Sequence, residues 1–376
     1  MARYKSIILS FLVMATWNSV SGQISKGYYA FKDGAEYTGD LKGRKPNGKG
    51  KTVMRNGDVY EGQYVKGKRH GFGTYIFQDG HKYIGEWNED MQEGKGIFYF
   101  QNNNQYDGMW EADMQQGEGN MYYYNGDVYK GAWKQNKRSG KGEYKWIGGA
   151  VYKGEWKDDL KDGTGVMIWE DGSKYEGEWL AGYRHGKGTF YYVNGDKYIG
   201  DWKDDMQHGK GVYYFQNGEK YEGDYVDGER TGKGVYTYPN GDRYNGEFKE
   251  GWQNGKGVFT WSNGAVYEGE WLRNQRSGNG TYKWANGDIY IGSWKNKMAE
   301  GNGELKTKEG LYHGEFKNGH ENGPGVITAD NGNKLEGNFK AGKKDGSFIE
   351  RNSSGKIIRK IEYRSGRILK QENVEQ

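Results

Sequence analysis

Large apolar residues and glycines recur along most of this chain with a period of 23 residues. A tyrosine marks each period and is counted here as position 0. Position 4 then carries a large apolar residue, and glycine dominates positions 2, 11, 13 and 20. Fourteen such units follow one another from Tyr37 to about residue 357, the last beginning at Leu335, and a partial unit precedes them. This spacing indicates a tandem-repeat protein.

Two strands are predicted in each unit, at positions 0 to 5 and 13 to 18, because apolar and polar residues alternate there and aromatic and β-branched residues are frequent. The sequence Pro239-Asn240-Gly241 favours a three-residue loop, with a type I turn followed by a left-handed glycine, over a two-residue turn. That loop pairs position 15 with the next tyrosine, position 13 with glycine 2, and position 11 with position 4. The residues between positions 5 and 13 are predicted to form a long turn.

With this register, one face of the sheet collects the tyrosines, the residues at positions 4, 15 and 17, and the glycines. Rings then stack along the sheet over facing glycines, which have no side chain to obstruct them. The opposite face receives position 3, which is Asp or Glu in nine units. The predicted aromatic ladder comprises Tyr83, Trp87, Tyr106, Trp110, Tyr129, Trp133, Tyr152, Trp156, Tyr175, Trp179, Tyr198, Trp202, Tyr267, Trp271, Tyr290 and Trp294.

The predicted fold class is therefore all-β. It is an elongated, single-layer antiparallel β-meander of fourteen hairpin repeats with a C-terminal capping hairpin. Twenty-eight strands at a spacing of about 4.8 Å would give a twisted ribbon about 130 Å long. The domain organisation follows the repeats: residues 23–36 form a partial repeat, residues 37–357 the fourteen repeats, and residues 358–376 a basic cap.

Composition and charge narrow the function classes. The chain has 66 Gly, 33 Tyr, 14 Trp and 13 Phe, but hydrophobic residues are only 34% in all. This leaves little aliphatic material for a conventional core, while so many aromatic residues argue against disorder. The net charge of +4 is small and no repeat face carries a basic excess, which excludes nucleic acid as a partner. The absence of Cys excludes thiol chemistry and disulfides.

The first 22 residues resemble a signal peptide. A short basic start is followed by an apolar run of ten residues at 7–16, and Val20 and Gly22 suit the positions before a cleavage site. Ten residues are about half of the roughly 20 needed to span a bilayer. We expect cleavage between Gly22 and Gln23 and export of the mature chain to the periplasm, the cell surface or the medium.

Basic residues are concentrated near the C-terminus, where 356–363 and 367–374 are predicted to form one more hairpin. Such side chains suit an exposed edge strand that must not pair with another molecule. They could instead bind acidic headgroups. The residues concerned are Lys356, Arg359, Lys360, Arg364, Arg367 and Lys370.

The sequence predicts no enzyme, no catalytic residue, no metal site and no cofactor. His70, His185 and His208 share position 10, and neighbouring copies of one position lie about 9 to 10 Å apart, too far to ligate one zinc ion. They are interpreted as turn residues. The segment from Gly43 to Lys49 imitates a phosphate-binding loop, but Gly follows where Ser or Thr should hold magnesium.

The unit at 175–197 reads YEGEWLAGYRHGKGTFYYVNGDK. Its YxGxW start, HGxG segment, aromatic stretch and NG turn resemble the MORN repeat, and the resemblance extends from residue 37 to about residue 357. It implies a non-catalytic interaction module. We expect an exported scaffold that binds protein partners; the alternative is a module that binds glycan or lipid headgroups on its aromatic face. The identity of the partner and the oligomeric state stay open.

A candidate binding surface lies at position 8. This position is predicted to be solvated, yet seven of the fourteen units carry a large apolar residue there. Turns of one type line up on one edge of the sheet, so these side chains would form an interrupted apolar ridge, and exposed apolar patches often mark interaction sites. The alternative is that each side chain folds back onto the adjacent turn. The predicted ridge consists of Met91, Met114, Leu160, Tyr183, Met206, Trp252 and Met298.

Overall fold

The computed structural model describes residues 23–374, so the predicted signal peptide lies outside the described residues. These residues form two compact units. Unit 1 comprises residues 23–147 and 156–159, and unit 2 comprises residues 148–155 and 160–374. The division falls within β12 (Val151–Lys157). All regular secondary structure in the described range is β-strand, and this range contains no helix able to cross a membrane.

The remaining strands are short and regularly spaced. Unit 1 contains β1 (Ser25–Ala30), β2 (Glu36–Lys42), β3 (Lys45–Val53), β4 (Val59–Val65), β5 (Lys68–Ile76), β6 (Lys82–Asn88), β7 (Met91–Tyr99), β8 (Gln105–Glu111), β9 (Met114–Tyr122), β10 (Val128–Lys134) and β11 (Lys137–Lys145). Unit 2 contains β13 (Leu160–Ile168), β14 (Lys174–Leu180), β15 (Tyr183–Tyr191), β16 (Lys197–Lys203), β17 (Met206–Tyr214), β18 (Lys220–Val226), β19 (Glu229–Thr237), β20 (Arg243–Lys249), β21 (Trp252–Thr260), β22 (Val266–Leu272), β23 (Gln275–Lys283), β24 (Ile289–Lys295), β25 (Met298–Thr307), β26 (Gly310–Lys317), β27 (His320–Thr328), β28 (Lys334–Lys340), β29 (Lys343–Lys344), β30 (Gly346–Arg351), β31 (Ile357–Arg364) and β32 (Arg367–Asn373).

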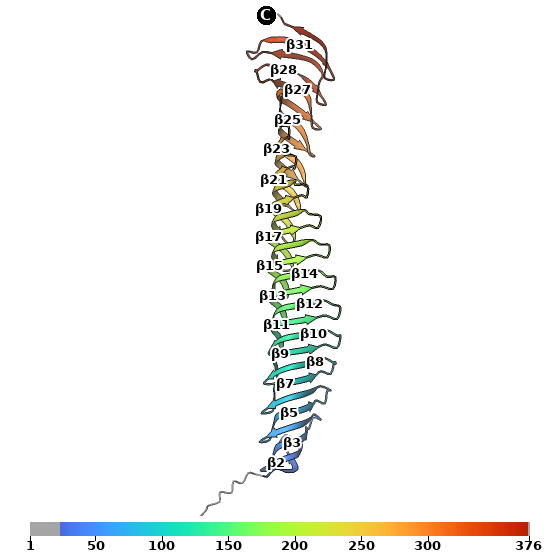
Figure 1. Ribbon diagram of the computed structural model, residues 1–376, viewed down its shortest axis with the longest axis vertical. Coiled ribbons are helices and arrows are strands. Elements are labelled where there is room, and N and C mark those ends of the chain that lie inside the picture. Colours follow the sequence, from blue (N-terminus) through green and yellow to red (C-terminus); the bar gives the residue numbers. More distant parts are fainter. Residues whose placement is uncertain (1–22, 375–376) are drawn as a thin grey trace, which may run out of the picture. The chain divides into compact units, whose positions relative to one another are not determined.

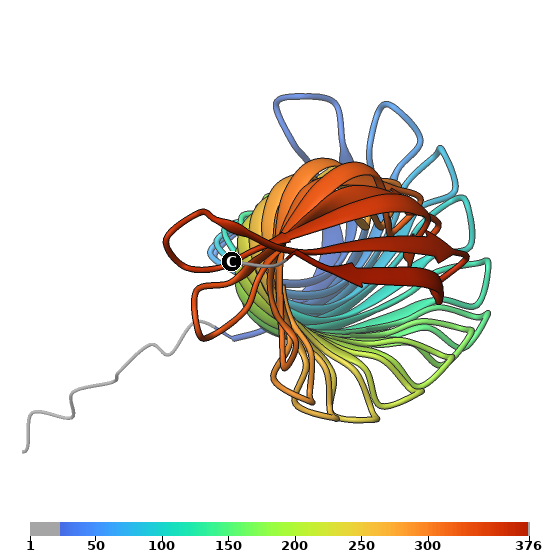
Figure 2. The ribbon, with the colours of Figure 1, turned by 90° about the horizontal axis from the view of Figure 1, so that it is seen from above.

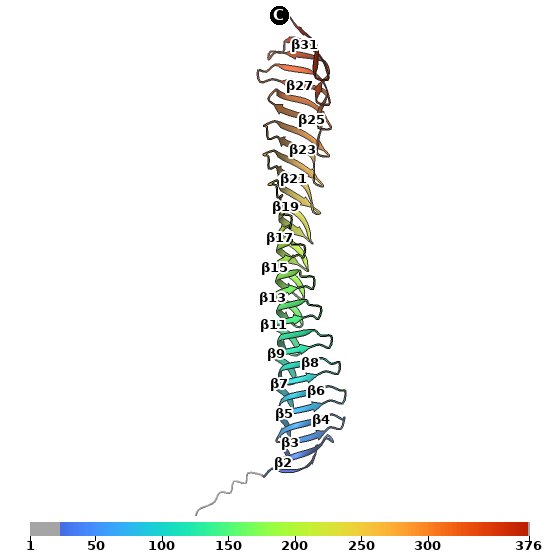
Figure 3. The same cartoon turned by 45° about the vertical axis from the view of Figure 1, so that its right-hand side comes forward.

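Within each unit, strands that are neighbours in the sequence pair antiparallel, which confirms the predicted single-layer meander (Figures 1 and 3). Successive strands of each unit are rotated relative to one another, as the right-handed twist of β-strands requires (Figure 2). The chain ends on the capping hairpin β31–β32, also as predicted.

The predicted pairing register is confirmed in both units. In unit 1, Phe98 at position 15 lies opposite Tyr106 at position 0, and Gly94 at position 11 lies opposite Trp110 at position 4. The same pairing recurs in unit 2 between β15 and β16. All of these side chains therefore share one face of the sheet, which we call the inner face.

The three-residue turn at positions 18 to 20 is also confirmed. The N–H of Trp169 donates to the carbonyl of Ser173 at 2.9 Å, and the N–H of Gly172 donates to the carbonyl of Trp169 at 3.0 Å. Gly172 has a φ of 87°, a left-handed conformation that glycine adopts without strain. This geometry is a type I turn followed by a glycine bulge.

The other turn is shorter than predicted. Leu180 lies opposite Tyr183, so only Ala181 and Gly182 form the turn, with φ values of 49° and 94°. This is a two-residue turn of the type that matches strand twist, and the prediction of a long turn is wrong. A bulge at Gly186, whose φ is 58°, absorbs two residues inside the second strand, so a glycine that suggested a turn in the sequence is a strand residue.

The same bulge corrects the interpretation of the position 10 histidines. His185 lies opposite Glu178 within the β14–β15 ladder, and His208 lies opposite Asp201 in β16–β17. These histidines are strand residues on the outer face and not turn residues.

The core of each repeat is a tyrosine lying over paired glycines. Tyr175 is fully buried, and its hydroxyl donates to the carbonyl of Glu178 at 2.9 Å. A Cβ atom at Gly177 or Gly188 would collide with the Tyr175 ring or hydroxyl. The glycines at positions 2 and 13 are thus required for the close approach of the ring.

Position 4 joins one tyrosine to the next. Trp202 packs edge to face on Tyr175 of the preceding repeat, with ring centroids 5.4 Å apart, and on Tyr198 of its own repeat at 5.2 Å. Its indole Nε1 donates to the carbonyl of Gly188 at 3.3 Å. The structure places all sixteen residues of the predicted ladder in this buried layer.

The last repeat preserves this packing with exchanged residues. Leu335 stands where the tyrosine is expected, and Phe348 stands where the position 13 glycine is expected. The Phe348 ring lies against Gly337 and is 1% exposed, so it fills the space that the tyrosine ring fills elsewhere. Two departures from the repeat pattern therefore compensate each other.

The outer face is charged, as predicted. Asp201 at position 3 pairs with Lys187 of the neighbouring strand and accepts a hydrogen bond from the backbone N–H of Lys210 at 3.0 Å. These contacts are partly solvated, and each is expected to contribute little to stability.

Candidate functional site

The predicted apolar ridge lies on the outer face, at the first residue of each second strand and not in a turn. Six of its seven side chains are exposed, up to 55% at Tyr183, and Met114 is half-buried. Copies in neighbouring repeats lie about 9 to 10 Å apart. Lys203 lies opposite Met206 and Lys249 opposite Trp252, so charged side chains interrupt the ridge in these repeats, whereas the exposed Leu180 lies opposite Tyr183. The binding role of the ridge stays a prediction.

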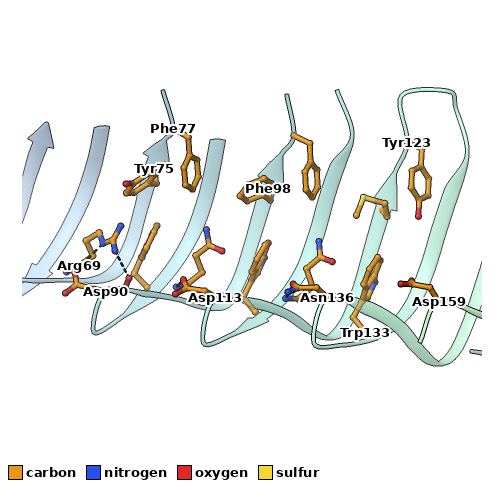
Figure 4. Close-up of a pocket in the computed structure, with 16 residues that line it drawn as sticks. Arg69, Tyr75, Phe77, Asp90, Phe98, Asp113, Tyr123, Trp133, Asn136 and Asp159 are labelled. Atoms are coloured by element: carbon orange, nitrogen blue, oxygen red, sulfur yellow. Dashed lines mark hydrogen bonds and ion pairs between the residues drawn. The ribbon is translucent and has the colours of Figure 1, made fainter. Parts of the chain in front are cut away.

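A groove of about 740 Å³ runs along the inner face of unit 1 (Figure 4). One wall is apolar and comes from positions 15 and 17, namely Tyr75, Phe77, Phe98, Phe100, Met121 and Tyr123. The other wall is polar and comes from positions 7 and 9, namely Arg69, Asp90, Gln92, Asp113, Gln115, Asn136 and Asp159. The indoles of Trp87, Trp110 and Trp133 complete the lining.

Arginine at position 9 closes the space above the position 4 indole. The guanidinium carbon of Arg69 lies 4.3 Å from the centroid of the Trp87 ring, and its Nε donates to Asp90 at 3.3 Å. Arg138 repeats this arrangement, since its Nε donates to Asp159 at 3.0 Å. Each arginine combines a cation–π contact with a charge-assisted hydrogen bond.

Between Arg69 and Arg138, two consecutive repeats carry glutamine at position 9. Gln92 and Gln115 are 6% and 5% exposed, and both line the groove. Their backbone N–H groups donate to Asp113 and Asn136 of the following turn, each at 2.7 Å. Within residues 23–374, neither side-chain amide has a hydrogen-bond partner. Because glutamine is shorter than arginine, the groove stays open here.

Glutamines at the same position in unit 2 are paired differently. The Gln207 amide donates to the Tyr192 hydroxyl at 3.0 Å, and the Gln253 amide donates to the Tyr238 hydroxyl at 3.4 Å. In both cases the tyrosine occupies position 17 of the preceding repeat. Arginines precede or follow these glutamines at position 9 in the neighbouring repeats, namely Arg184, Arg230 and Arg276.

Phenylalanine explains the unpaired amides of unit 1. Phe77 and Phe100 occupy position 17 before Gln92 and Gln115, where unit 2 has tyrosine. A phenyl ring offers no hydroxyl to the amide. The fully buried, unpaired polar atoms of the described residues include no atom of either amide, so solvent in the groove reaches both of them. The two unpaired amides are therefore open to a ligand.

Carboxylates outnumber cations in the groove lining, which has three aspartates and one arginine. Asp90 is paired with Arg69 and Asp159 with Arg138, whereas Asp113 is held by a backbone N–H alone. Burial raises the pKa of Tyr123 above its usual range, so this phenol stays neutral at physiological pH. The groove therefore offers apolar rings, amides and a modest negative charge, which suits recognition of a neutral or basic ligand.

The position 10 histidines do not form a metal centre. Nδ1 of His185 and of His208 is buried and has no hydrogen-bond partner in the described part of the chain. Nδ1 of His185 lies 3.9 Å from the Asp204 carboxylate, and Nδ1 of His208 lies 3.6 Å from the Asp227 carboxylate. Among residues 23–374, no group of three or more His, Asp or Glu side chains is arranged to hold a metal ion.

A basic edge lies along the last two-residue turns of unit 2. Its members are exposed, and the described residues provide no ion-pair partner for any of them: Lys295, Lys297, Lys317, Lys340, Lys343, Arg364 and Arg367. Exposed Met298, Ile368 and Leu369 accompany them. The C-terminal hairpin thus continues a cationic row that begins several repeats earlier, which sequence analysis of the hairpin alone did not show.

Comparison with known families assigns the repeat. A sequence model of the MORN repeat matches thirteen consecutive segments, from residues 37–59 to residues 312–334. The chain belongs to the MORN-repeat family. The fourteenth unit, with Leu335 and Phe348, lies outside the matched segments. MORN repeats are generally modules for protein or membrane interaction.

Similarity to solved structures is weak. The TCP domain of SAS-4 from Drosophila melanogaster, solved in complex with a proline-rich motif of Ana2, is 15% identical; the match covers 42% of this chain and 85% of that one, with a TM-score of 0.27. The TCP10 domain of CPAP from Danio rerio is 11% identical, covering 65% and 92%, with a TM-score of 0.19. A virginiamycin B lyase from Staphylococcus aureus is 12% identical, covering 89% and 97%, with a TM-score of 0.13. No curated protein matches the chain.

Sequence analysis missed position 9. Its residues vary between Arg, Gln, Lys and other types, whereas the predicted ladder was built from the invariant positions. The sequence does contain a signal for this site. Position 9 reads Arg69, Gln92, Gln115 and Arg138 in four consecutive repeats, so two glutamines stand between two arginines.

Proposed function

We propose that this protein is a non-catalytic scaffold that binds an extended segment of a partner protein in the inner groove of unit 1. The observation that carries the proposal is the pair of unpaired amides of Gln92 and Gln115, which face the groove beside an aromatic wall. Backbone amides of an extended peptide complement such side chains, since each can both donate and accept. The repeat architecture supports a scaffold, because it supplies a preformed surface at little entropic cost to binding.

The aromatic wall would also suit a neutral glycan, which the sequence left as an alternative. The Asp113 carboxylate, which has no basic partner, disfavours acidic glycans and anionic headgroups in this groove. A peptide is favoured over a sugar because the amides recur once per repeat along a groove that crosses several strands. A neutral glycan is therefore an outcome of the test and not the proposal.

The test is peptide display against the mature chain, with a glycan array in parallel. Binding of the selected peptides is then measured to wild type and to the variant Gln92→Arg/Gln115→Arg, in which arginine should close the groove as in neighbouring repeats. The matched control is Gln207→Arg/Gln253→Arg in unit 2. We expect the first variant to lose about tenfold or more in affinity, or 1.4 kcal/mol, and the control to bind normally. Equal binding to wild type and both variants would place the site elsewhere.

A second candidate function rests on the basic edge of unit 2. Unpaired cations beside exposed apolar side chains are suited to an anionic membrane surface, where each cation contributes about 1 kcal/mol. The test is co-sedimentation with phosphatidylcholine vesicles with and without phosphatidylglycerol, using Lys317→Glu/Lys340→Glu/Arg364→Glu. Binding that requires phosphatidylglycerol and is lost in the variant supports this function. Binding unaffected by the charge reversal contradicts it.

Export is part of the proposal and is supported by the basic start, apolar run and Val20/Gly22 pair of the first 22 residues. Mass spectrometry of the protein recovered outside the cytoplasm should show a chain beginning at Gln23 or within a residue or two of it. Recovery of the protein with Met1 intact would contradict cleavage.

A further inference from the structure

We propose that the segment bound in the groove of unit 1 is proline-rich and adopts the polyproline II conformation. This inference rests on the proposed function and specifies the partner of the same site. It is carried by three independent features of the groove: the spacing of its repeats, the unpaired amides of Gln92 and Gln115, and its charge.

The spacing of the repeats matches the pitch of polyproline II. Equivalent groups in consecutive hairpins are separated by two inter-strand distances, or about 9.4 to 9.8 Å. A polyproline II helix has three residues per turn and a rise of about 3.1 Å per residue, which gives a pitch of about 9.3 Å. A peptide in this conformation running along the groove therefore presents an equivalent residue to each repeat. Over three repeats the mismatch amounts to only about 1 Å.

Other regular peptide conformations do not match. A β-strand presents the same face every two residues, or about 6.7 Å, so it comes into register with the repeats only at every second repeat and does not offer an equivalent residue to each one. An α-helix has a pitch of about 5.4 Å, so two turns exceed the spacing by about 1 Å in every repeat. An α-helix with its side chains is also about 10 Å across. Its own side chains would keep its backbone away from the glutamine amides of the groove.

The chemistry of the two walls fits the same conformation. Polyproline II has no internal hydrogen bonds, so its carbonyl groups are free to accept from side-chain amides. Gln92 and Gln115 supply such donors at one per repeat. The opposite wall presents Phe98, Phe100 and Tyr123, and aromatic-lined grooves are the usual docking surface for proline rings.

Charge selects between proline-rich sequences. Asp113 lines the groove without a basic partner, whereas Asp90 and Asp159 are paired with Arg69 and Arg138. A segment flanked by basic residues should therefore bind better than one flanked by acidic residues. The chain itself has only three prolines, widely separated, so the segment belongs to another protein and not to a second copy.

The experiment compares two peptides of identical composition by fluorescence anisotropy with the full mature chain. Both have a core of about twelve residues, four prolines and eight alanines, which spans about 37 Å in polyproline II form, and both carry an added lysine flank. One has proline at every third residue, and the other has its four prolines in one block. We expect the spaced peptide to bind at least about tenfold more tightly, and a glutamate flank to weaken it.

The variant Phe77→Tyr/Phe100→Tyr tests the role of the amides. It introduces the hydroxyls that Tyr192 and Tyr238 supply in unit 2, keeps both rings, and should occupy the Gln92 and Gln115 amides. We expect affinity for the spaced peptide to fall about tenfold with an unchanged thermal melt. Gln92→Leu/Gln115→Leu, which keeps the groove open but removes the donors, should lose affinity as well.

The possible outcomes separate the two proposals. Equal affinity for the spaced and block peptides, no binding of either, or no effect of the hydroxyls overturns the polyproline inference. If the displayed peptides then lack proline but still require an open groove, the proposed function stands and this inference fails. If no peptide depends on the groove, both fail.

Discussion

The inner faces of the two units are built from one repeat but differ at two positions. In unit 1, Gln92 and Gln115 follow each other at position 9, and phenylalanine precedes each at position 17. In unit 2, Gln207 stands between arginines, and the hydroxyl of Tyr192 occupies its amide. The tyrosines, the large apolar residues at position 4 and the glycines recur in both units, apart from the exchanged residues of the last repeat.

This difference separates the residues that make the fold from those that make a site. The tyrosine, its two glycines and position 4 build every hairpin. The residue at position 9 then decides whether the space over the indole is filled. Where position 9 is glutamine, the residue at position 17 decides whether the glutamine amide has a hydrogen-bond partner. A repeat protein can in this way open a groove at one place by two substitutions per repeat that leave its core unchanged.

The largest expected effect concerns the shared core. Trp110→Ala in unit 1 and Trp179→Ala in unit 2 each remove a ring that is 4% to 6% exposed, and each should cost about 3 kcal/mol of unfolding free energy. Urea unfolding with a probe in each unit measures both. The control Glu178→Ala, on the outer face, should cost less than about 0.5 kcal/mol. A small loss in only one unit would show that the cores are not equivalent.

Alkaline pH should weaken both units. Burial, together with the nearby Asp40 carboxylate, raises the pKa of Tyr37 in unit 1 to about 12, and burial raises that of Tyr267 in unit 2 to about 12, from an ordinary value of 10.0. A raised pKa means that the folded state keeps the phenol proton to higher pH than the unfolded state does. The stabilisation by the neutral phenol is therefore complete below pH 10.0 and is lost as pH rises toward about 12. The urea midpoint should fall over this window. A constant midpoint would contradict the burial of the phenols.

A reciprocal exchange at position 9 should have a smaller effect. Arg184→Gln removes hydrogen bonds to Asp205 at 2.9 and 2.7 Å and a cation–π contact with Trp202, and should cost about 1 to 2 kcal/mol. Gln92→Arg should be nearly neutral, because Asp113 already occupies the turn position that pairs with arginine elsewhere. Equal losses of unfolding free energy from both exchanges would show that the repeat of Gln92 does not accept arginine as the repeat of Arg184 does.

The smallest effect on stability is expected at the apolar ridge. Met206→Ser/Trp252→Ser alters side chains that are 43% and 50% exposed, so the melting curve should shift by less than the equivalent of about 0.5 kcal/mol. If the ridge binds a partner, the same variant weakens capture of that partner. A much earlier melt would show that these side chains have a structural role on the outer face.

Much of this fold follows from periodicity. The register was predictable because Pro239 and the following Asn-Gly specify one loop, and a slip of one residue would expose the rings. The two-residue turn was not predictable in the same way, because Gly186 takes a left-handed conformation within a strand and resembles a turn glycine in the sequence. Local patterns do not distinguish a bulge from a turn when both require glycine.

The groove was less accessible to sequence reasoning than the fold. It depends on Gln92 having Phe77 and not tyrosine as its neighbour, and these residues are brought together by pairing between consecutive repeats. The register predicted from the sequence already places positions 9 and 17 on one face. The predicted register did not show how far each position 9 side chain extends over the indole. This length decides whether the space over the indole is filled.

The most direct measurement transfers the groove from one unit to the other. A chain carrying Gln92→Arg/Gln115→Arg should no longer bind the peptide with proline at every third residue. Adding Arg184→Gln/Tyr192→Phe creates two consecutive open repeats in unit 2 and leaves the Gln207 amide unpaired. We predict that anisotropy then detects binding again, to within about tenfold of the wild-type affinity. A folded chain of this kind that binds no better than its parent would contradict the claim that positions 9 and 17 determine the site.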